Sequence, residues 1–250
     1  MATTVAPHTD EIRFAQSCRV AVRVLDDATI HPHDLFITMV SKHLDRCRQP
    51  EWLDAGCGWH FDWRWEHERE RAMLSQANVI GLDPDWQAVS KHRTITRRTV
   101  GKVEALPFAN GSFDLVTANV VVEHLKYPSV AFAEILRVLR PGGCFMFRTP
   151  SAHSYFVRLA KILPERVKIW LASKVIENRD PSDIYPTYYR VNTVAVIQEI
   201  CKLVGFRELV VTVTRVRGIV AKLPAVARLE RAGASLLGVT EGNLIAEVYR

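Results

Sequence analysis

The alternation of strand and helix patterns after Pro50 constrains the fold of this chain more than any other feature. Apolar runs at 51–56 (EWLDAG) and 78–83 (NVIGLD) each end in a turn, and helical patterns follow them. Similar runs predict strands at 98–106, 112–120, 144–149, 207–216 and 243–250, with helices at 86–93, 128–139 and 193–206 between them. Alternating strands and helices form parallel sheets with helices on both faces. We therefore expect an α/β fold, in which the last two strands form an antiparallel edge.

The domain organisation follows from the same patterns. Residues 1–33 are weakly periodic and read as an N-terminal arm with a helix around 11–24, and a helical stripe covers 34–47. Two further segments, at about 153–190 and 215–240, interrupt the strand order as helical inserts. We expect a single domain over 34–250, with the inserts as its lid.

The composition excludes several classes of protein. Every apolar stretch is broken by charge before the ~18 residues that a membrane span needs. The N-terminus lacks the basic and apolar regions of a secretory signal. The five cysteines are scattered without a CxxC pair, which argues against a disulfide framework or a zinc site and favours a reducing compartment. We expect a cytoplasmic protein that needs no metal.

The positive charge is concentrated in the inserts. The formal net charge is +6, and the segments 153–176 and 215–231 each hold five basic side chains and one acidic one. Their apolar residues recur at helical spacing opposite these charges. Such helices bind anionic lipid at the inner face of a membrane, or they pack on the core as a lid over an active site. Both interpretations are compatible with the sequence.

The turn at the end of the first strand, in LDAGCG, indicates a ligand site. Gly56 and Gly58 let a ligand approach the backbone closely. The GxGxxG pattern of a dinucleotide site is absent, because Phe61 stands at the third glycine position. Asp54 precedes the turn, where a carboxylate suits an ammonium group, and Asp83 ends the next strand, where it can accept ribose hydroxyls. A ligand with a ribose, an ammonium group and no phosphate matches S-adenosylmethionine.

Five motifs in order resemble the class I S-adenosylmethionine-dependent methyltransferases of the small-molecule branch. They are LDAGCG, VIGLDPD, VEALPFANGSFDLVTANVVVEHL, AEILRVLRPGGCFMFRTPS and the GF before the sixth strand. The segment from LPERVKIWL to DIYPTYYRVNT is also similar to bacterial members found near glycan-assembly genes. The resemblance implies a Rossmann-like methyltransferase fold, with a mostly parallel seven-stranded sheet and an antiparallel edge strand.

The resemblance also implies a set of cofactor-binding residues. The methionine side of S-adenosylmethionine would lie on the first turn, the ribose on the second strand and the adenine on the loop before LPF, with the reactive methyl group by the fourth strand. In this order the residues are Asp54, Ala55, Gly56, Cys57 and Gly58; Asp83 and Pro84; Val103 and Glu104; Asn119 and Val120. Two positions depart from the family pattern, because Lys102 replaces an aspartate and His60 a third glycine.

Methyl transfer needs aligned reactants and, for a hydroxyl acceptor, a base. His124 and His153 are the candidate catalytic residues, because histidine titrates near ~6.5 and both follow strands at the site. Tyr188, Tyr189 and Arg190 are candidates for binding a hydroxylated or anionic acceptor, or for anchoring the insert. Cys57 needs only small size inside its turn, and its sequence neighbours offer nothing that lowers a thiol pKa.

We interpret the chain as an enzyme that methylates a small molecule or a glycan- or lipid-linked acceptor at oxygen. One alternative is a nucleic-acid methyltransferase, suggested by the basic pI. Against it, the Pro-Pro-aromatic motif of such enzymes is replaced by ANVVVEH, so we expect no nucleic-acid partner. Another alternative is a module that binds S-adenosylmethionine without catalysis, for which the two departures from the family pattern are the support.

Overall fold

The computed structural model of the chain describes residues 18–25, 30–59, 67–154, 157–158, 185–215 and 241–250. Most of both inserts lies outside the described residues, and so does His60. The expectations of a lid and of membrane contact concern these segments, and both stay predictions.

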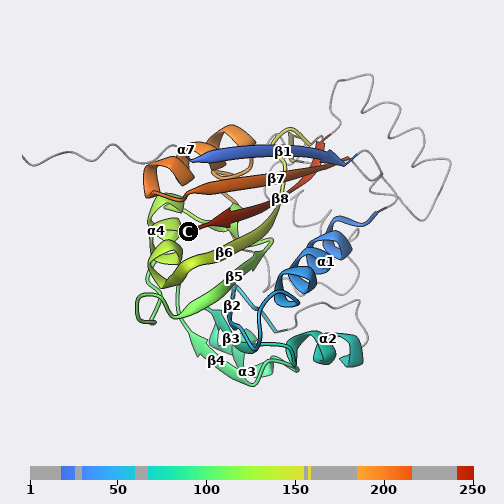
Figure 1. The fold of residues 1–250 in the computed structure, drawn as a ribbon, viewed down its shortest axis with the longest axis vertical. Coiled ribbons are helices and arrows are strands. Elements are labelled where there is room, and N and C mark those ends of the chain that lie inside the picture. The colour runs from blue at the N-terminus through green and yellow to red at the C-terminus, as the bar shows by residue number, and fades with distance from the viewer. Residues whose placement is uncertain (1–17, 26–29, 60–66, 155–156, 159–184, 216–240) are drawn as a thin grey trace, which may run out of the picture.

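Eight strands and five α-helices make up the described fold (Figure 1). The strands are β1 (Arg19–Leu25), β2 (Glu51–Ala55), β3 (Asn78–Asp83), β4 (Arg97–Val100), β5 (Phe113–Asn119), β6 (Leu139–Pro150), β7 (Glu208–Arg215) and β8 (Glu241–Tyr249). The helices are α1 (Pro32–Leu44), α2 (His67–Leu74), α3 (Trp86–Lys91), α4 (Pro128–Val138) and α7 (Val194–Val204), with a 3₁₀ turn η1 (Val122–His124).

The strands form one sheet in the order β1-β7-β8-β6-β5-β2-β3-β4. All pairs are parallel except those of β8, which runs antiparallel to both β6 and β7. The expected α/β fold with a mostly parallel sheet is confirmed, and the last two strands pair antiparallel as expected. The sheet has eight strands instead of seven because β1 adds to β7 at the edge.

The helix that we expected around residues 11–24 is wrong over its described part, because residues 19–25 form the strand β1. Val20, Val22 and Val24 recur with period two, which suits a pleated strand better than a helix. All seven residues of β1 pair in register with β7, from Arg19 with Glu208 to Leu25 with Thr214. The part of the expected helix before residue 18 lies outside the described residues.

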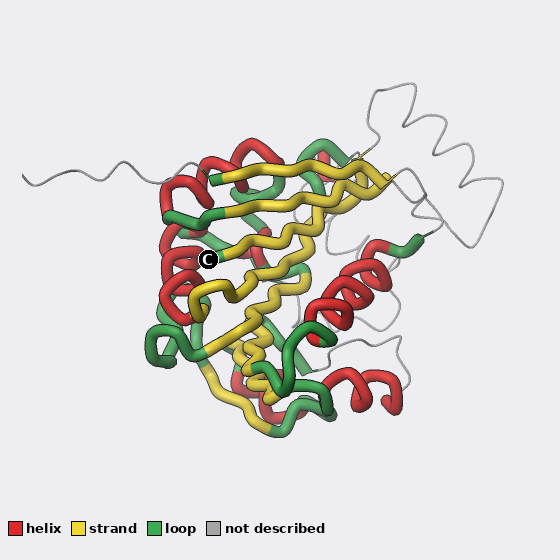
Figure 2. The backbone as a smooth tube through the Cα atoms, in the orientation of Figure 1, coloured by secondary structure: helices red, strands yellow, loops and turns green. Residues whose placement is uncertain are grey.

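Helices cover both faces of the sheet (Figure 2). On one face α1 and α2 pack over Trp52, Leu115 and Met146 in a single apolar cluster. On the other face α4 and α7 pack over β5, β6 and β7. Local signals explain where these helices begin and end: Thr193 caps the start of α7 with its hydroxyl, and Gly205 ends it at a φ of +101°.

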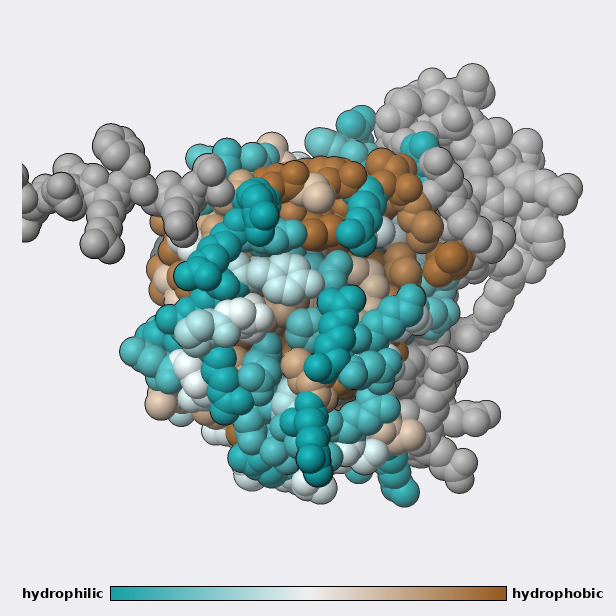
Figure 3. Space-filling model, in the orientation of Figure 1, coloured by the Kyte–Doolittle hydropathy of each residue, from teal (hydrophilic) through white to brown (hydrophobic). Residues whose placement is uncertain are grey.

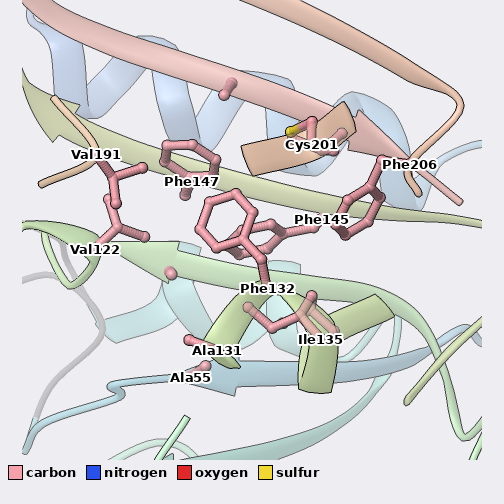
Figure 4. Packing of buried hydrophobic residues seen from close by; sticks show 14 of the residues in the cluster. Ala55, Val122, Ala131, Phe132, Ile135, Phe145, Phe147, Val191, Cys201 and Phe206 are labelled. Carbon is pink, nitrogen blue, oxygen red and sulfur yellow. The ribbon is translucent and has the colours of Figure 1, made fainter. Parts of the chain in front are cut away.

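The larger core lies between the sheet and helices α4 and α7 (Figure 4). Phe132 of α4 is fully buried, and its ring meets Phe145, Phe147 and Phe206 edge-on, at centroid distances of 5.3, 5.7 and 6.4 Å. Each edge-to-face pair adds ~0.5–1.5 kcal/mol beyond the burial of its area. This packing joins α4 to β6 and to Phe206, which lies between α7 and β7.

The surface over β1 is more apolar than its surroundings (Figure 3). Val22 and Val24 are about half exposed there.

Among the described residues, no helix combines the length and the apolar character that crossing a membrane requires.

Candidate functional site

The carboxyl ends of β2 and β5 meet at the point where the chain changes direction across the sheet. From β2 the chain moves outward to β3 and β4, and it then returns to β5 and β6 on the other side of β2. Open α/β sheets bind ligands at such a switch point. Asp54 lies near the end of β2 and Asn119 ends β5, so the sequence-predicted residues gather where the fold favours a ligand.

The glycine turn after β2 takes a backbone that other residues rarely adopt. Gly56 and Gly58 have φ values of +78° and +58°. The N–H groups of Gly56 and Cys57 both donate to the carbonyl of Leu82 on β3, at 2.7 and 3.1 Å. A Cβ on Gly56 would lie 2.4 Å from a methyl group of Val121, whereas a Cβ on Gly58 would meet no atom of the described residues within 4 Å. Gly56 is therefore required for packing, and the described part of the chain leaves space beside Gly58.

Asp83 closes the turn from the neighbouring strand. Its Oδ2 accepts a hydrogen bond from the N–H of Gly58 at 3.0 Å, and its Oδ1 accepts one from the N–H of Asp85 at 2.9 Å. The side chain is buried, and two backbone donors fix its orientation.

Asp54 is held by a chain of hydrogen bonds inside the sheet. The hydroxyl of Thr117 donates to Asp54 Oδ1 at 2.7 Å, and the indole N–H of Trp52 donates to Thr117 at 2.8 Å. All three residues are buried. Because the indole can only donate, the hydroxyl proton of Thr117 is directed to the carboxylate.

The carboxylates of Asp54 and Asp83 both affect the pKa of Cys57, which lies in the turn between them. Burial raises the pKa of the Cys57 thiol, and the charges of Asp54 and Asp83 raise it further. Both negative charges therefore reach the same few residues. Cys57 is a packing residue: its sulfur lies where a Cβ on Gly81 would be only 2.9 Å away. The net shift of the Cys57 pKa is upward, although the charge of Arg98 lowers it.

These residues fit the cofactor that the sequence motifs imply. Open space beside Gly58 gives room for a ligand, and two buried carboxylates favour a ligand that carries positive charge. The sulfonium and the ammonium of S-adenosylmethionine are such charges. Ala55 lies buried in β2 and Pro84 is exposed just after Asp83.

The loop after β4 approaches Asp83 through its backbone. The N–H of Gly101 donates to the carbonyl of Asp83 at 3.1 Å. Val103 points into the core and Glu104 is half-buried, whereas Lys102 is exposed. The side chain of Lys102, which departs from the family pattern, is therefore exposed to solvent, and the adenine contact at Val103 and Glu104 stays a prediction.

An ion pair on α4 holds the same loop in place. Arg137 bonds both carboxylate oxygens of Glu134, and it donates to the carbonyls of Leu106 and Phe108. Glu134 also accepts from the N–H of Leu106 at 2.8 Å. The bond from Arg137 lowers the pKa of Glu134. Sequence reasoning missed this support, although the pair stands three residues apart on a predicted helix.

The backbone is strained directly after β5, where we expect the reactive methyl group of the cofactor to lie. Val120 has a φ of +61°, which is an outlier for a β-branched residue. Its N–H donates to the carbonyl of Arg148 at 2.9 Å, which helps hold this conformation. Strained backbone of this kind clusters at functional sites.

Two residues that the sequence did not indicate contact Asn119. Arg148 of β6 donates from Nε to Asn119 Oδ1 at 2.8 Å. The Nδ2 of Asn119 lies 3.2 Å from Nδ1 of His33, which is buried at the start of α1. His33 belongs to the expected N-terminal arm, and it is 86 residues from Asn119 in the chain.

His124 lies in η1, directly after the strained residues. Its Nδ1 is 3.0 Å from the carbonyl of Pro186, and its ring meets Tyr185 edge-on. A carbonyl only accepts, so Nδ1 carries the proton and Nε2 has the lone pair of the neutral ring. This is the tautomer that a general base at Nε2 requires, and the catalytic role stays a prediction.

The segment that carries the other candidate residues docks on η1. The N–H groups of Tyr188 and Tyr189 donate to the carbonyl of Glu123, and Arg190 donates to the carbonyl of Lys126 at 2.7 Å. The segment is therefore anchored to η1, which was one of the two expectations for these residues. Acceptor binding by them stays a prediction.

Glu123 is a buried acid beside the same turn. Burial raises the pKa of its carboxyl, which accepts a hydrogen bond from Thr149 at 3.0 Å. Asn192 donates to Thr149 in turn, at 2.7 Å. The carboxyl therefore joins η1 to β6 and to the chain before α7.

His153 lies shortly after the carboxyl end of β6, beside the start of β8. Its Nδ1 is 3.4 Å from Glu241 at the start of β8, and its side chain is about half exposed. The structure pairs it with this acid, and its catalytic role is untested.

A separate hollow of about 400 Å³ lies between α1 and the strands β1, β7 and β8. Its lining includes Arg23, Lys42, Arg46 and Glu247, and it shares no residue with the glycine turn. It is therefore distinct from the candidate cofactor site. Among the described residues, no group of three or more His, Cys, Asp or Glu side chains is placed to hold a metal ion.

Comparison with known proteins shows which domain and fold the chain resembles. Residues 53–147 match the family model described as a methyltransferase domain. A malonyl-[acyl-carrier protein] O-methyltransferase from Erwinia billingiae is 39% identical over 104 residues, covering 41% of this chain and 39% of the relative. The protein of the same description from Hahella chejuensis is 30% identical over 152 residues, covering 59% of this chain and 53% of the relative. The chain thus spans about half or less of the length of these two relatives.

A solved structure matches more of the chain. An S-adenosylmethionine-dependent methyltransferase from Mesorhizobium loti superposes with a TM-score of 0.55 at 17% identity, covering 85% of this chain and 96% of that one. The fold is that of the class I S-adenosylmethionine-dependent methyltransferases, as the motifs implied. The match to the methyltransferase-domain model covers residues 53–147 of this chain, and S-adenosylmethionine is the cofactor of this class.

Proposed function

We propose that this chain transfers the methyl group of S-adenosylmethionine to an oxygen atom of a small-molecule, carrier-linked or glycan-linked acceptor. One observation carries the proposal: Asp54 and Asp83 are buried at neighbouring strand ends and act on the same glycine turn. The O-methyltransferase descriptions of the two curated relatives support oxygen as the methylated atom.

The residues of the chain have separate tasks in this reaction. Asp83 accepts the ribose hydroxyls, while the N–H of Gly58 holds its carboxylate in place. Asp54 faces the ammonium group from the end of β2. The open space at Gly58 lets the methionine moiety pass close to the backbone. When bound, S-adenosylmethionine supplies an activated methyl group on a sulfonium.

Asn119 and Val120 border the position at which the acceptor meets this methyl group. The hydrogen bonds from Arg148 to Asn119 and from Val120 to Arg148 keep that border rigid. Positioning of this kind provides a large part of the acceleration in a two-substrate reaction. For a hydroxyl acceptor, Nε2 of His124 is the nitrogen that takes the proton.

The proposal is tested by incubating the protein with methyl-labelled S-adenosylmethionine and a cell extract. The extract is then separated into lipid, glycan, protein, nucleic-acid and small-molecule fractions. We expect label in the small-molecule or glycan fraction, or on a carrier. Label mainly in nucleic acid contradicts the proposed acceptor class. Cofactor binding without transfer to any fraction identifies a non-catalytic module.

A further inference from the structure

The strand β1 forms one edge of the sheet (Figure 1). Its inner side pairs with β7 along its whole length, and among the described residues no strand pairs with its outer side. The side chains of Val22 and Val24 are 50% and 56% exposed. The strand contains no proline, and its pairing with β7 runs without a register shift. A straight, apolar edge of this kind is a template for pairing with another strand.

The backbone groups on the outer side of β1 belong to valines. The N–H of Arg19 donates to the carbonyl of Arg207 on the β7 side, at 2.9 Å. Successive residues of a strand direct their N–H and C=O groups to opposite sides, so the odd-numbered residues of β1 face β7. The outward N–H and C=O groups are therefore those of Val20, Val22 and Val24.

The charges of β1 select one way in which two copies of the strand can pair. In a two-fold antiparallel pair, the central residue lies opposite its own copy. With Ala21 or Arg23 at the centre, an arginine lies directly opposite an arginine, which is unfavourable. With Val22 at the centre, Arg19 lies opposite Leu25. Arg23 then lies opposite Ala21, so no two charges face each other. Centres nearer to either end leave most of the strand unpaired.

The register centred on Val22 also brings the exposed valines together. Val22 lies opposite its own copy, and Val20 lies opposite Val24 of the second copy. Because these residues carry the outward backbone groups, each opposing pair can exchange both of its N–H···O=C bonds. Cross-strand contacts between β-branched side chains add to this pairing.

The arginines remain separated in this register. Arg19 keeps its ion pair with Glu208, at 3.1 Å on the neighbouring strand. Arg23 and its copy are diagonal neighbours, about 7–8 Å apart, and both are exposed to water, which weakens their repulsion. The strand is therefore complementary to itself in its charges, its valines and its backbone groups.

We propose that two copies of this chain pair through β1, antiparallel and centred on Val22, and so join their sheets across a two-fold axis. The inference goes beyond the proposed function and does not depend on it. Strands β7, β8, β6 and β5 separate β1 from β2, so the glycine turn stays accessible in such a dimer. One strand pair is a small interface compared with the ~800 Å² per partner of stable complexes, so we expect a dissociation constant in the micromolar range.

The first test is sedimentation velocity of the full chain. Between about 1 and 100 µM we expect the sedimentation coefficient to rise from that of a monomer to that of a dimer. Val22→Lys places an ammonium group directly opposite its copy, so this variant should stay monomeric. The matched control is Val100→Lys, which changes a valine that is 44% exposed on β4, at the opposite edge of the sheet. The control should dimerise like the wild type.

Disulfide formation tests the register. The variants also carry Cys47→Ser, because Cys47 is an exposed thiol. Val22→Cys should form a covalent dimer under mild oxidation, since the Cα atoms of such an opposing pair are about 5.5 Å apart, within the range of a disulfide. Val24→Cys is the control of similar exposure. It should stay largely monomeric, because Val20 lies opposite it.

The outcomes of these experiments are distinct. A wild type that stays monomeric up to about 100 µM overturns the inference, whichever segment or partner then covers the edge. A Val22→Lys variant that dimerises like the wild type overturns it as well. Equal cross-linking of Val22→Cys and Val24→Cys overturns the proposed pairing. The Tm of Val22→Lys shows whether this variant folds, and if it does not, the two cysteine variants decide.

Discussion

The N–H of Gly58 and the carboxylate of Asp83 are joined by a 3.0 Å hydrogen bond across 25 residues of sequence. Gly58 follows β2 and Asp83 ends β3, so this bond couples the glycine turn to the neighbouring strand end. A carboxylate held by a backbone amide keeps one orientation before a ligand arrives. Preorganisation of this kind lowers the entropy that binding costs.

Gly58→Ala should weaken cofactor binding with only a small loss of stability. An alanine at a φ of +58° costs about 1–2 kcal/mol of backbone strain. The added Cβ would enter the open space that we assign to the cofactor. We expect a Tm lower by roughly 2–8 °C and a clear loss of affinity in calorimetry.

Gly111→Ala is the matched control. Gly111 has a φ of +63° and also meets no atom within 4 Å, but it lies in the turn before β5, at the amino end of the strand. Its Tm should fall by a similar amount while cofactor affinity stays unchanged. Equal affinities of the two variants would contradict the placement of the cofactor beside Gly58.

Glu123→Gln should stabilise the protein more at high pH than at low pH. Burial raises the pKa of Glu123, so the folded carboxyl keeps its proton at pH values where the unfolded chain has lost it. Its contribution to stability is fully present below the unfolded pKa of about 4.3, and it declines as pH rises toward the folded pKa. Glutamine does not ionise and keeps an acceptor for Thr149.

The measurement is the Tm of wild type and variant between pH 4 and pH 8. The Tm of the variant should increase relative to that of the wild type as pH rises. A constant difference across this range would mean that Glu123 is ionised in the folded protein at neutral pH.

Glu134→Gln should show the opposite pH dependence. Its bond with Arg137 lowers the pKa of Glu134, so its contribution is present above the unfolded pKa and declines as pH falls through the folded value. We expect the variant to be less stable than the wild type at pH 7 and to approach it toward pH 3. Denaturant melts at these two pH values make the comparison, and a deficit that grows in acid would refute the assignment.

The Glu134→Gln variant also tests whether Glu134 and Arg137 hold the loop after β4 in place. Leu106 donates to Glu134, and Arg137 donates to the carbonyls of Leu106 and Phe108. Hydrogen exchange at these residues should become faster in the variant, without a change at the glycine turn.

The sequence predicts the cofactor half of the site because its signals are local. Asp54, Gly56 and Gly58 stand together in one turn, and Asp83 ends the next strand, so strand order alone brings them together. The alternation of elements likewise predicts the sheet and its covering helices.

The acceptor half depends on contacts between distant parts of the chain. His33 reaches Asn119 across 86 residues and Arg148 reaches it across 29. Nothing in the local pattern of α1 indicates that its first turn meets the end of β5. The partner of β1, β7, also lies almost 190 residues further along the chain, although the valines of β1 recur with period two and are a local signal of a strand.

The most direct test of the cofactor site is a calorimetric titration of Asp83→Asn with S-adenosylmethionine. The variant keeps the size of the side chain and removes the charge that accepts the ribose hydroxyls. Hydrogen bonds to charged groups contribute about 1.5–3 kcal/mol, so we expect affinity to fall by roughly 10–150-fold. The asparagine side chain can accept only one of the two backbone N–H bonds that Asp83 accepts, so we also expect a lower Tm. The control variant is Asp85→Asn. It keeps a side-chain cap for α3 and the backbone N–H that donates to Asp83, so it should bind S-adenosylmethionine like the wild type. An Asp83→Asn variant that binds S-adenosylmethionine as tightly as the wild type would contradict the account.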